Sequence, residues 1–150
     1  MGLKEKLQAD LTDAIKARNE TKAGTIRMVL AAITTEEVSG KQARVLTDAE
    51  IITVLSREAK KRREAIDAYA AANRADLVAK EKSESDVISA YLPEQLSDSE
   101  IEKLVQDAIN QTGASGPSGM GQVMKFLQPK IAGKADGGKV SAIVKKALGS

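Results

Sequence analysis

Apolar residues recur every three or four positions along almost the whole chain, and no segment alternates with period two between turn signals. Side chains three and four residues apart share one face of an α-helix, so this pattern predicts amphipathic helices and no strands. Seven helices are predicted. The first residue of the apolar stripe or of the cap that marks each of them is Leu3, Ile26, Thr47, Asn73, Ser97, Met120 and Asp136. We therefore expect an all-α fold.

Polar residues at the predicted helix ends support these boundaries. Thr47 and Ser97 are each followed three residues later by a glutamate, which is the signature of a capping box. Gly113 is expected to end the fifth helix and Pro129 the sixth, because glycine terminates helices readily and proline cannot continue them. Asp136 is expected to cap the seventh helix with its carboxylate.

The segment around Tyr91-Leu92-Pro93 divides the predicted helices into two groups. We expect a bundle of four helices over residues 1–93 and a small domain of three helices over residues 94–150. The net charge divides with them: the chain carries +2 in total, but residues 114–150 hold six lysines against one aspartate, a net charge of +5. The near-neutral total therefore conceals a basic C-terminal segment and an acidic remainder.

The composition excludes several kinds of chemistry. The 150 residues include neither cysteine nor histidine, which removes disulfides, histidine-assisted nucleophiles, and zinc, haem or iron–sulfur sites built on those residues. Acidic pairs such as Glu36-Glu37 are adjacent on a helix and do not converge in a cleft. We predict no catalytic residue, no cofactor site and no metal site.

No part of the sequence approaches the roughly 20 apolar residues of a membrane span, and the first residues do not read as a targeting signal. The sequence therefore predicts a cytoplasmic protein without a membrane partner.

The basic C-terminal segment contains the first candidate site. Its lysines flank a predicted helix break, and its glycines would let a ligand approach the backbone beside a helix N-terminus, whose dipole favours anions. The candidate RNA-binding residues are Lys125, Lys130, Gly133, Lys134, Gly137 and Lys139. Asp136 would compete with an anion for that helix end, and Phe126 could stack on a base or belong to the core. From these residues alone, nucleic-acid contact and a structural role remain equally open.

A second basic group lies in the third predicted helix. Its candidate members are Arg57, Lys60, Lys61 and Arg63. Cations so closely spaced spread around about 200° or more of the helix and cannot all meet one surface. We therefore favour a solvated helix face, with a phosphate or partner contact as the alternative. The glycine-rich segment 113–121 lacks the Gly-Lys-Ser/Thr end of a phosphate loop, which favours a plain connector between helices.

Several blocks of the sequence, in order and spacing, resemble the GatB/YqeY family. They are Thr25–Ile33 with Glu36 and Glu37, Lys60–Ile66, Tyr91–Pro93, Met120–Met124, Pro129–Lys130 and Gly133–Gly137. The resemblance implies an all-α protein whose small C-terminal domain is similar to the tail of the B subunit of glutamine-dependent aspartyl/glutamyl-tRNA amidotransferase, a module that contacts tRNA. Gln122 stands where relatives often have lysine, which removes one possible phosphate contact.

The resemblance also implies a family label, carbon–nitrogen ligase with glutamine as amide donor. The amidotransferase's catalytic site belongs to a much larger N-terminal domain, for which this chain has no room. We therefore predict a tRNA-binding or amidotransferase-associated module without catalysis of its own. The alternatives are a protein-interaction module for a partner subunit and a ligase acting alone.

Overall fold

The computed structural model describes residues 2–149, and these residues form α-helices and one short 3₁₀ turn without any strand. The all-α prediction is confirmed. The chain divides into two compact units, Met1–Leu92 and Pro93–Ser150. Each unit has its own hydrophobic core, so each is described by itself.

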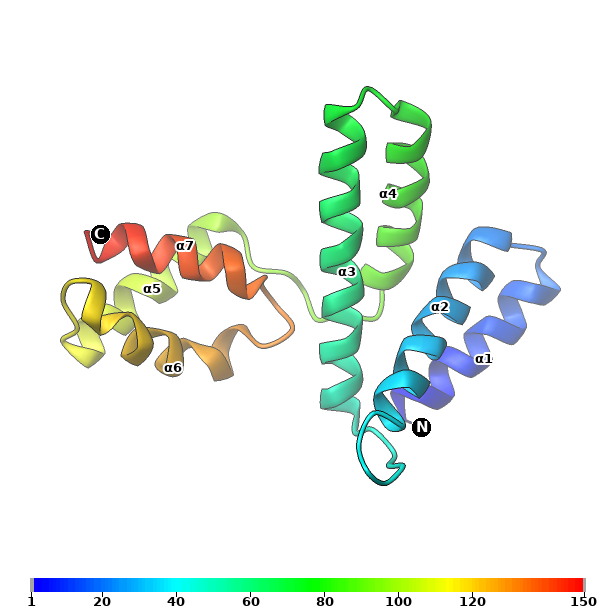
Figure 1. Ribbon diagram of the computed structural model, residues 1–150, viewed down its shortest axis with the longest axis horizontal. Helices are drawn as coiled ribbons and strands as arrows, with labels where there is room; N and C mark the ends of the chain where they lie inside the picture. The colour runs from blue at the N-terminus through cyan, green and yellow to red at the C-terminus, as the bar shows by residue number, and fades with distance from the viewer. Residues whose placement is uncertain (1, 150) are drawn as a thin grey trace. The chain divides into compact units, whose positions relative to one another are not determined.

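The first unit contains four helices, α1 (Leu3–Lys16), α2 (Glu20–Glu37), α3 (Asp48–Ala71) and α4 (Ala75–Ser89). In Figure 1, α1 runs beside α2 and α3 runs beside α4. Their apolar stripes meet in one core, because each helix buries the positions that the sequence spacing placed on a single face. The buried members of this core are Leu7, Ile26, Val29, Ile33, Leu46, Ile51, Val54, Leu55, Ala59 and Ile88.

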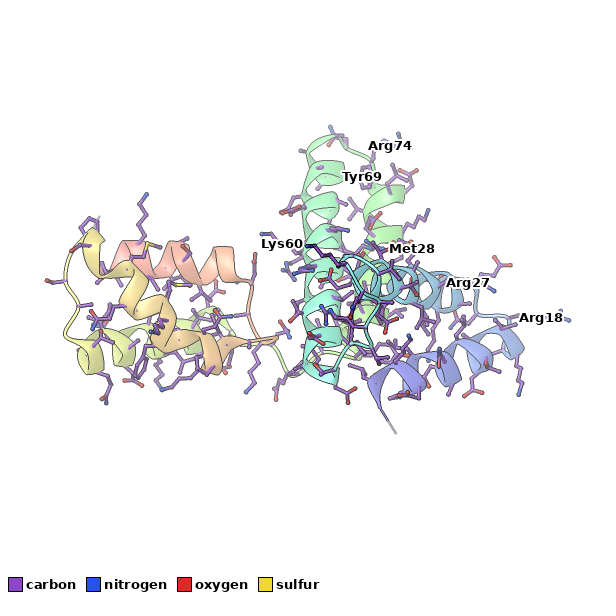
Figure 2. The ribbon with its side chains drawn as sticks, turned by 60° about the horizontal axis from the view of Figure 1, so that its bottom comes forward. Arg18, Arg27, Met28, Lys60, Tyr69 and Arg74 are labelled. Atoms are coloured by element: carbon purple, nitrogen blue, oxygen red, sulfur yellow. The ribbon has the colours of Figure 1, made fainter. Side chains whose placement is uncertain are left out.

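Two residues in the left-handed backbone region form the tight turns of the first unit. Arg18, with φ 56°, lies between α1 and α2, and Asn73, with φ 58°, lies between α3 and α4. Figure 2 shows Arg18 at the first turn and Arg74 at the second. Asparagine adopts this conformation more readily than arginine does. Asn19 then starts α2 by accepting a hydrogen bond from the Lys22 amide, at 3.1 Å.

The two expected capping boxes differ in completeness. At α3 the Thr47 hydroxyl accepts from the Glu50 amide at 3.2 Å, and the Glu50 carboxylate accepts from the Thr47 amide at 2.8 Å. This box is complete, as predicted. At α5 the Ser97 hydroxyl accepts from the Glu100 amide at 3.2 Å, but it also donates to the Glu100 carboxylate. That carboxylate is thereby turned to the hydroxyl, and only half of the second box forms.

The second unit contains α5 (Asp98–Thr112), the 3₁₀ turn η1 (Pro117–Gly119), α6 (Met120–Ile131) and α7 (Gly137–Ala147). The three α-helices surround a core formed by Ile101, Val105, Ala108, Val123, Leu127, Ile131, Val140 and Val144. The segment before α5 is held to the turn between α6 and α7. The Leu96 amide donates to the Lys134 carbonyl at 2.9 Å, and the Gln95 side chain donates to the Gly133 carbonyl at 2.8 Å.

One predicted helix boundary is wrong. Pro129 does not end α6, which continues to Ile131. A proline removes one backbone hydrogen bond, yet near the end of a helix the next turn can still close, and here the Ala132 amide donates to the Gln128 carbonyl at 3.1 Å. Helix α2 begins at Glu20, because the Asn19 cap starts the helix ahead of the apolar stripe that marks it in the sequence.

Candidate nucleic-acid interface

Two candidate lysines and the phenylalanine lie on one flank of α6. Val123 and Leu127 of this helix are fully buried, whereas Lys125 and Lys130 are exposed and Phe126 is half-buried. At 100° per residue, positions 125 to 130 place the three side chains within about 140° of arc, with Lys125 farthest from the buried stripe and Lys130 beside it. This flank therefore presents two cations on either side of one aromatic ring.

The ring of Phe126 has two neighbours that fix its position. It packs against the core of the second unit, and the ammonium of Lys130 lies 4.5 Å from its centroid. A cation over a ring face is attracted by the negative charge of that face. Both sequence-based interpretations of Phe126 thus have a basis in the structure, since the ring supports the core and is still partly accessible.

Lys134 and Gly133 form the turn that follows α6. Gly133 has φ 73°, a conformation that favours glycine, and its carbonyl accepts from the Gln95 side chain. The backbone of the turn is thus held in place, while the side chain of Lys134 is exposed. Gly137 is different: a Cβ there would meet no atom within 4 Å. The fold of the described residues does not require glycine at this position, which leaves room for a ligand to approach the backbone.

Asp136 and Lys139 are both engaged by neighbours in the second unit. The Asp136 carboxylate caps α7 by accepting from the Gly138 amide at 3.1 Å, so it competes with an incoming anion as expected. The ammonium of Lys139 forms an ion pair with Asp98 of α5. The structure therefore places Lys125, Lys130 and Lys134 on α6 and the turn after it, and directs Lys139 toward α5 instead.

The basic group of α3 is partly neutralised within the first unit. Arg57 lies 3.5 Å from the Glu36 carboxylate of α2, and Lys61 lies 3.2 Å from Glu58. Lys60, labelled in Figure 2, and Arg63 are exposed on the same helix. These pairs fit the solvated helix face favoured by the sequence. A phosphate or partner contact through this group stays a prediction.

Arg62 belongs to the same basic run of α3, and it has a structural role that the sequence did not predict. Its side chain is only 7% exposed, and its guanidinium lies 3.3 Å from Glu58, 3.2 Å from Glu84 and 3.6 Å from Glu81. Its Nη2 also lies 3.6 Å from the sulfur of Met28 on α2. The sequence held one sign of this burial, because Arg62 lies three residues after Ala59 and so falls in the apolar stripe of α3.

A second polar contact ties the end of α4 to α1. The hydroxyl of Tyr91 donates to the Asp10 carboxylate at 2.6 Å, and Lys6 lies 3.0 Å from the same carboxylate. The hydrogen bond from Tyr91 first, and that from Lys6 next, hold the pKa of Asp10 below its usual value. Burial and the neighbouring carboxylate raise the pKa of Tyr91 well above its usual value. This contact fixes the residue from which the chain leaves the first unit.

The glycine-rich segment 113–121 is explained by packing inside the second unit. Gly113 ends α5 with φ 68°, and a Cβ on Gly119 would lie 2.8 Å from the Cβ of Ala114. Glycine is therefore needed for the turn and for close contact. Gln122, at the start of α6, donates to the Thr112 carbonyl at 3.4 Å and so also serves this connection.

Within residues 2–149, no group of three or more acidic side chains has the arrangement of a metal site. Across the same residues, no helix is both long enough and apolar enough to cross a membrane.

Comparison with known proteins identifies the family of the chain. The family model described as Yqey-like protein matches residues 4–148. The chain belongs to the YqeY-like family. The resemblance drawn from its sequence blocks is thereby confirmed, and the match spans both units.

Relatives of this YqeY-like chain include proteins from several species. It is 30% identical to "Altered inheritance of mitochondria protein 41, mitochondrial" of Pyrenophora tritici-repentis, over 97% of this chain and 80% of that protein. It is 34% identical to the protein of the same name from Saccharomyces cerevisiae strain YJM789, over 64% of this chain and 51% of that protein. It is also 34% identical to an uncharacterized protein of Schizosaccharomyces pombe, over 61% of this chain and 72% of that protein. Two of these names describe mitochondrial proteins, so a cytoplasmic location stays a prediction for this chain.

Proposed function

We propose that this YqeY-like protein is an RNA-binding module without catalysis of its own, and that its second unit contacts tRNA. The observation that carries the proposal is the basic flank of α6 and the turn after it. There Lys125, Lys130 and Lys134 are exposed, with Lys130 over the Phe126 ring, in a segment whose net charge is +5. Lysines neutralise phosphates, and an aromatic ring can stack on an unpaired base.

The partners of the individual lysines support the choice of these three. Lys139 and Arg57 are each paired with a carboxylate, and a phosphate would have to displace that carboxylate. Lys130 lies over an aromatic face, and within residues 2–149 Lys125, Lys130 and Lys134 form no ion pair. Cations without a carboxylate partner are the ones that gain most from meeting a phosphate.

The choice of tRNA rests on the family. The sequence blocks of the second unit are similar to the tRNA-contacting tail of the amidotransferase B subunit. Association with amidotransferase subunits is the second part of the proposal. Recovery of those subunits with the protein before, but not after, nuclease treatment would mean that RNA mediates the association.

Titration of labelled tRNA with the full-length protein at several salt concentrations tests the proposal. Three phosphate contacts predict that log K falls by about 2 to 3 units per unit of log salt concentration. The variants Lys125→Glu and Lys134→Glu should each weaken binding at every salt concentration and make that slope shallower by about 1.

Lys103→Glu is the matched control, because Lys103 is an exposed lysine of α5 outside the proposed interface and the substitution changes the net charge equally. It should weaken binding less than either interface variant. If all three variants lost the same tRNA affinity, the effect would come from net charge alone, and the proposed interface would be contradicted. No binding of tRNA at low salt would overturn the proposal.

A further inference from the structure

The second unit has a groove on another of its surfaces, between α5 and α7. Its volume is about 610 Å³, and its floor is apolar, formed by Val105 of α5 together with Ala142 and Ile143 of α7. Val105 is buried, Ile143 is half-buried and Ala142 is exposed. None of the three lysines of the proposed RNA interface lines this groove. It is therefore a separate surface, and the inference drawn from it does not depend on RNA binding.

The two walls of the groove carry opposite charges. Asp98 and Glu102, four residues apart, project from α5, and Lys139 and Lys146, seven residues apart, project from α7. The ion pair between Asp98 and Lys139 bridges the groove at one end. Further along, Glu102 and Lys146 form no ion pair with each other or with any other described residue. An acidic side chain and a basic side chain thus flank an open apolar floor.

We propose that this groove binds one amphipathic α-helix of a partner protein, a helix whose apolar stripe has basic residues along one flank and acidic residues along the other. The length of the groove fits a helix. From Lys139 to Lys146 it extends about 10 Å, or two helical turns, so a guest would place apolar residues at positions i, i+3 or i+4, and i+7 on the floor. Its basic flank would meet Glu102 and its acidic flank would meet Lys146.

The acidic wall argues against nucleic acid as the occupant. A phosphate chain that reached Lys146 would also lie beside Asp98 and Glu102, and like charges across an interface are strongly unfavourable. An opposite charge on each wall instead selects a guest that carries both signs. Turning such a guest end for end exchanges its flanks and would set like charges against both walls, so the charges of the groove also fix the direction of a given guest.

Three synthetic helical peptides with the same apolar stripe test the proposal. One carries lysines on one flank and glutamates on the other, one carries lysines on both flanks, and one carries glutamates on both. Fluorescence anisotropy with the full-length protein should show that the mixed peptide binds at least about tenfold more tightly than the other two. Equal affinities, or no binding of the mixed peptide up to about 1 mM, would overturn the proposal.

Charge-reversed variants make the test specific to the groove. Lys146→Glu should shift the preference to the peptide with two basic flanks, and Glu102→Lys should shift it to the peptide with two acidic flanks. The double variant has opposite charges again and should again prefer the mixed peptide. These residues are exposed, so the fold should tolerate the changes, and circular dichroism checks that it does.

Two controls complete the design. Lys103→Glu changes the net charge as Lys146→Glu does, but Lys103 does not line the groove, so the order of peptide affinities should not change. Ala142→Glu places a carboxylate on the floor and should weaken binding of the mixed peptide. Sedimentation of the protein alone addresses a second copy as the occupant: a dimer disrupted by Ala142→Glu would overturn the assignment to a partner protein.

Discussion

Tyr91 makes the contact whose energetics follow most directly from a single side chain. Its hydroxyl donates to the carboxylate of Asp10, and both groups are partly buried between α4 and α1. A hydrogen bond to a charged group is stronger than one between neutral groups. Because Asp10 keeps some exposure to water, part of this gain is lost to solvent screening.

Replacing Tyr91 with phenylalanine should therefore lower the free energy of unfolding by about 1 to 2 kcal/mol at pH 7. The ring and its packing remain in this variant, so the decrease in the free energy of unfolding measures the contribution of the hydroxyl alone. Tyr69→Phe is the matched control, because Tyr69 is half-buried at the end of α3 and its hydroxyl makes no hydrogen bond within residues 2–149. Urea unfolding of the two variants measures the difference, and equal effects would contradict the role given to Tyr91.

The same pair gives the expected pH dependence. The folded pKa of Asp10 lies below its ordinary value of 3.8, so its contribution to stability is complete above about pH 4 and is lost as the pH falls through the folded value. The hydrogen bond from Tyr91 is the largest cause of the lowered pKa. The gap in stability between the wild type and Tyr91→Phe should be constant from pH 7 to about pH 5 and should shrink below about pH 4.

At the scale of elements, Arg62 joins α3 to α4. Glu58 lies one turn before it on α3, but Glu81 and Glu84 belong to α4. Three carboxylates close to one buried guanidinium would repel one another without it. Removing one partner of a buried ionic group leaves uncompensated charge, which is far more costly than losing a pair at the surface.

Arg62→Ala should therefore lower the free energy of unfolding by about 3 to 5 kcal/mol. Arg57→Ala is the control on the same helix: Arg57 is 61% exposed, and its removal should cost less than about 1 kcal/mol. Urea unfolding compares the two, and a loss for Arg62→Ala no larger than that for Arg57→Ala would contradict the role of this network.

The helices themselves were largely predictable from the sequence, because their causes are local. The spacing of apolar residues and caps such as Thr47 with Glu50 act within one or two turns. The position of Pro129 inside α6 was not predictable by the same rule, since the cost of one missing hydrogen bond is offset by the burial of Ile131 against the core. The Arg62 network was missed because its partners on α4 lie about 20 positions along the chain.

At the scale of the whole molecule, the two separate cores predict two unfolding transitions. A unit with its own core can unfold on its own. Thr47→Ala removes the cap of α3 and should lower the stability of the first unit by about 1 kcal/mol, and Ser97→Ala should do the same for the second. In calorimetry each variant should shift a different transition. A single transition shifted by both variants would contradict this prediction.

The candidate interface was predictable as a segment but not as a set of residues. The excess of lysine after residue 114 is plain in the sequence. Which of those lysines pair with a carboxylate depends on residues far away in the sequence, such as Asp98 for Lys139. The groove between α5 and α7 was missed for the same reason, because its walls come from helices that are far apart in the chain.

The hydrogen bond between Asp10 and Tyr91 also has a consequence for synthesis of the chain. The two residues are 81 positions apart. During synthesis, this hydrogen bond therefore cannot form until nearly all of the first unit has left the ribosome. Domains generally fold as units and N-terminal ones first, and here the contact forms as the residue just before Leu92 and Pro93 becomes available. The contact that joins the two ends of the first unit thus forms when the second unit begins to leave the ribosome.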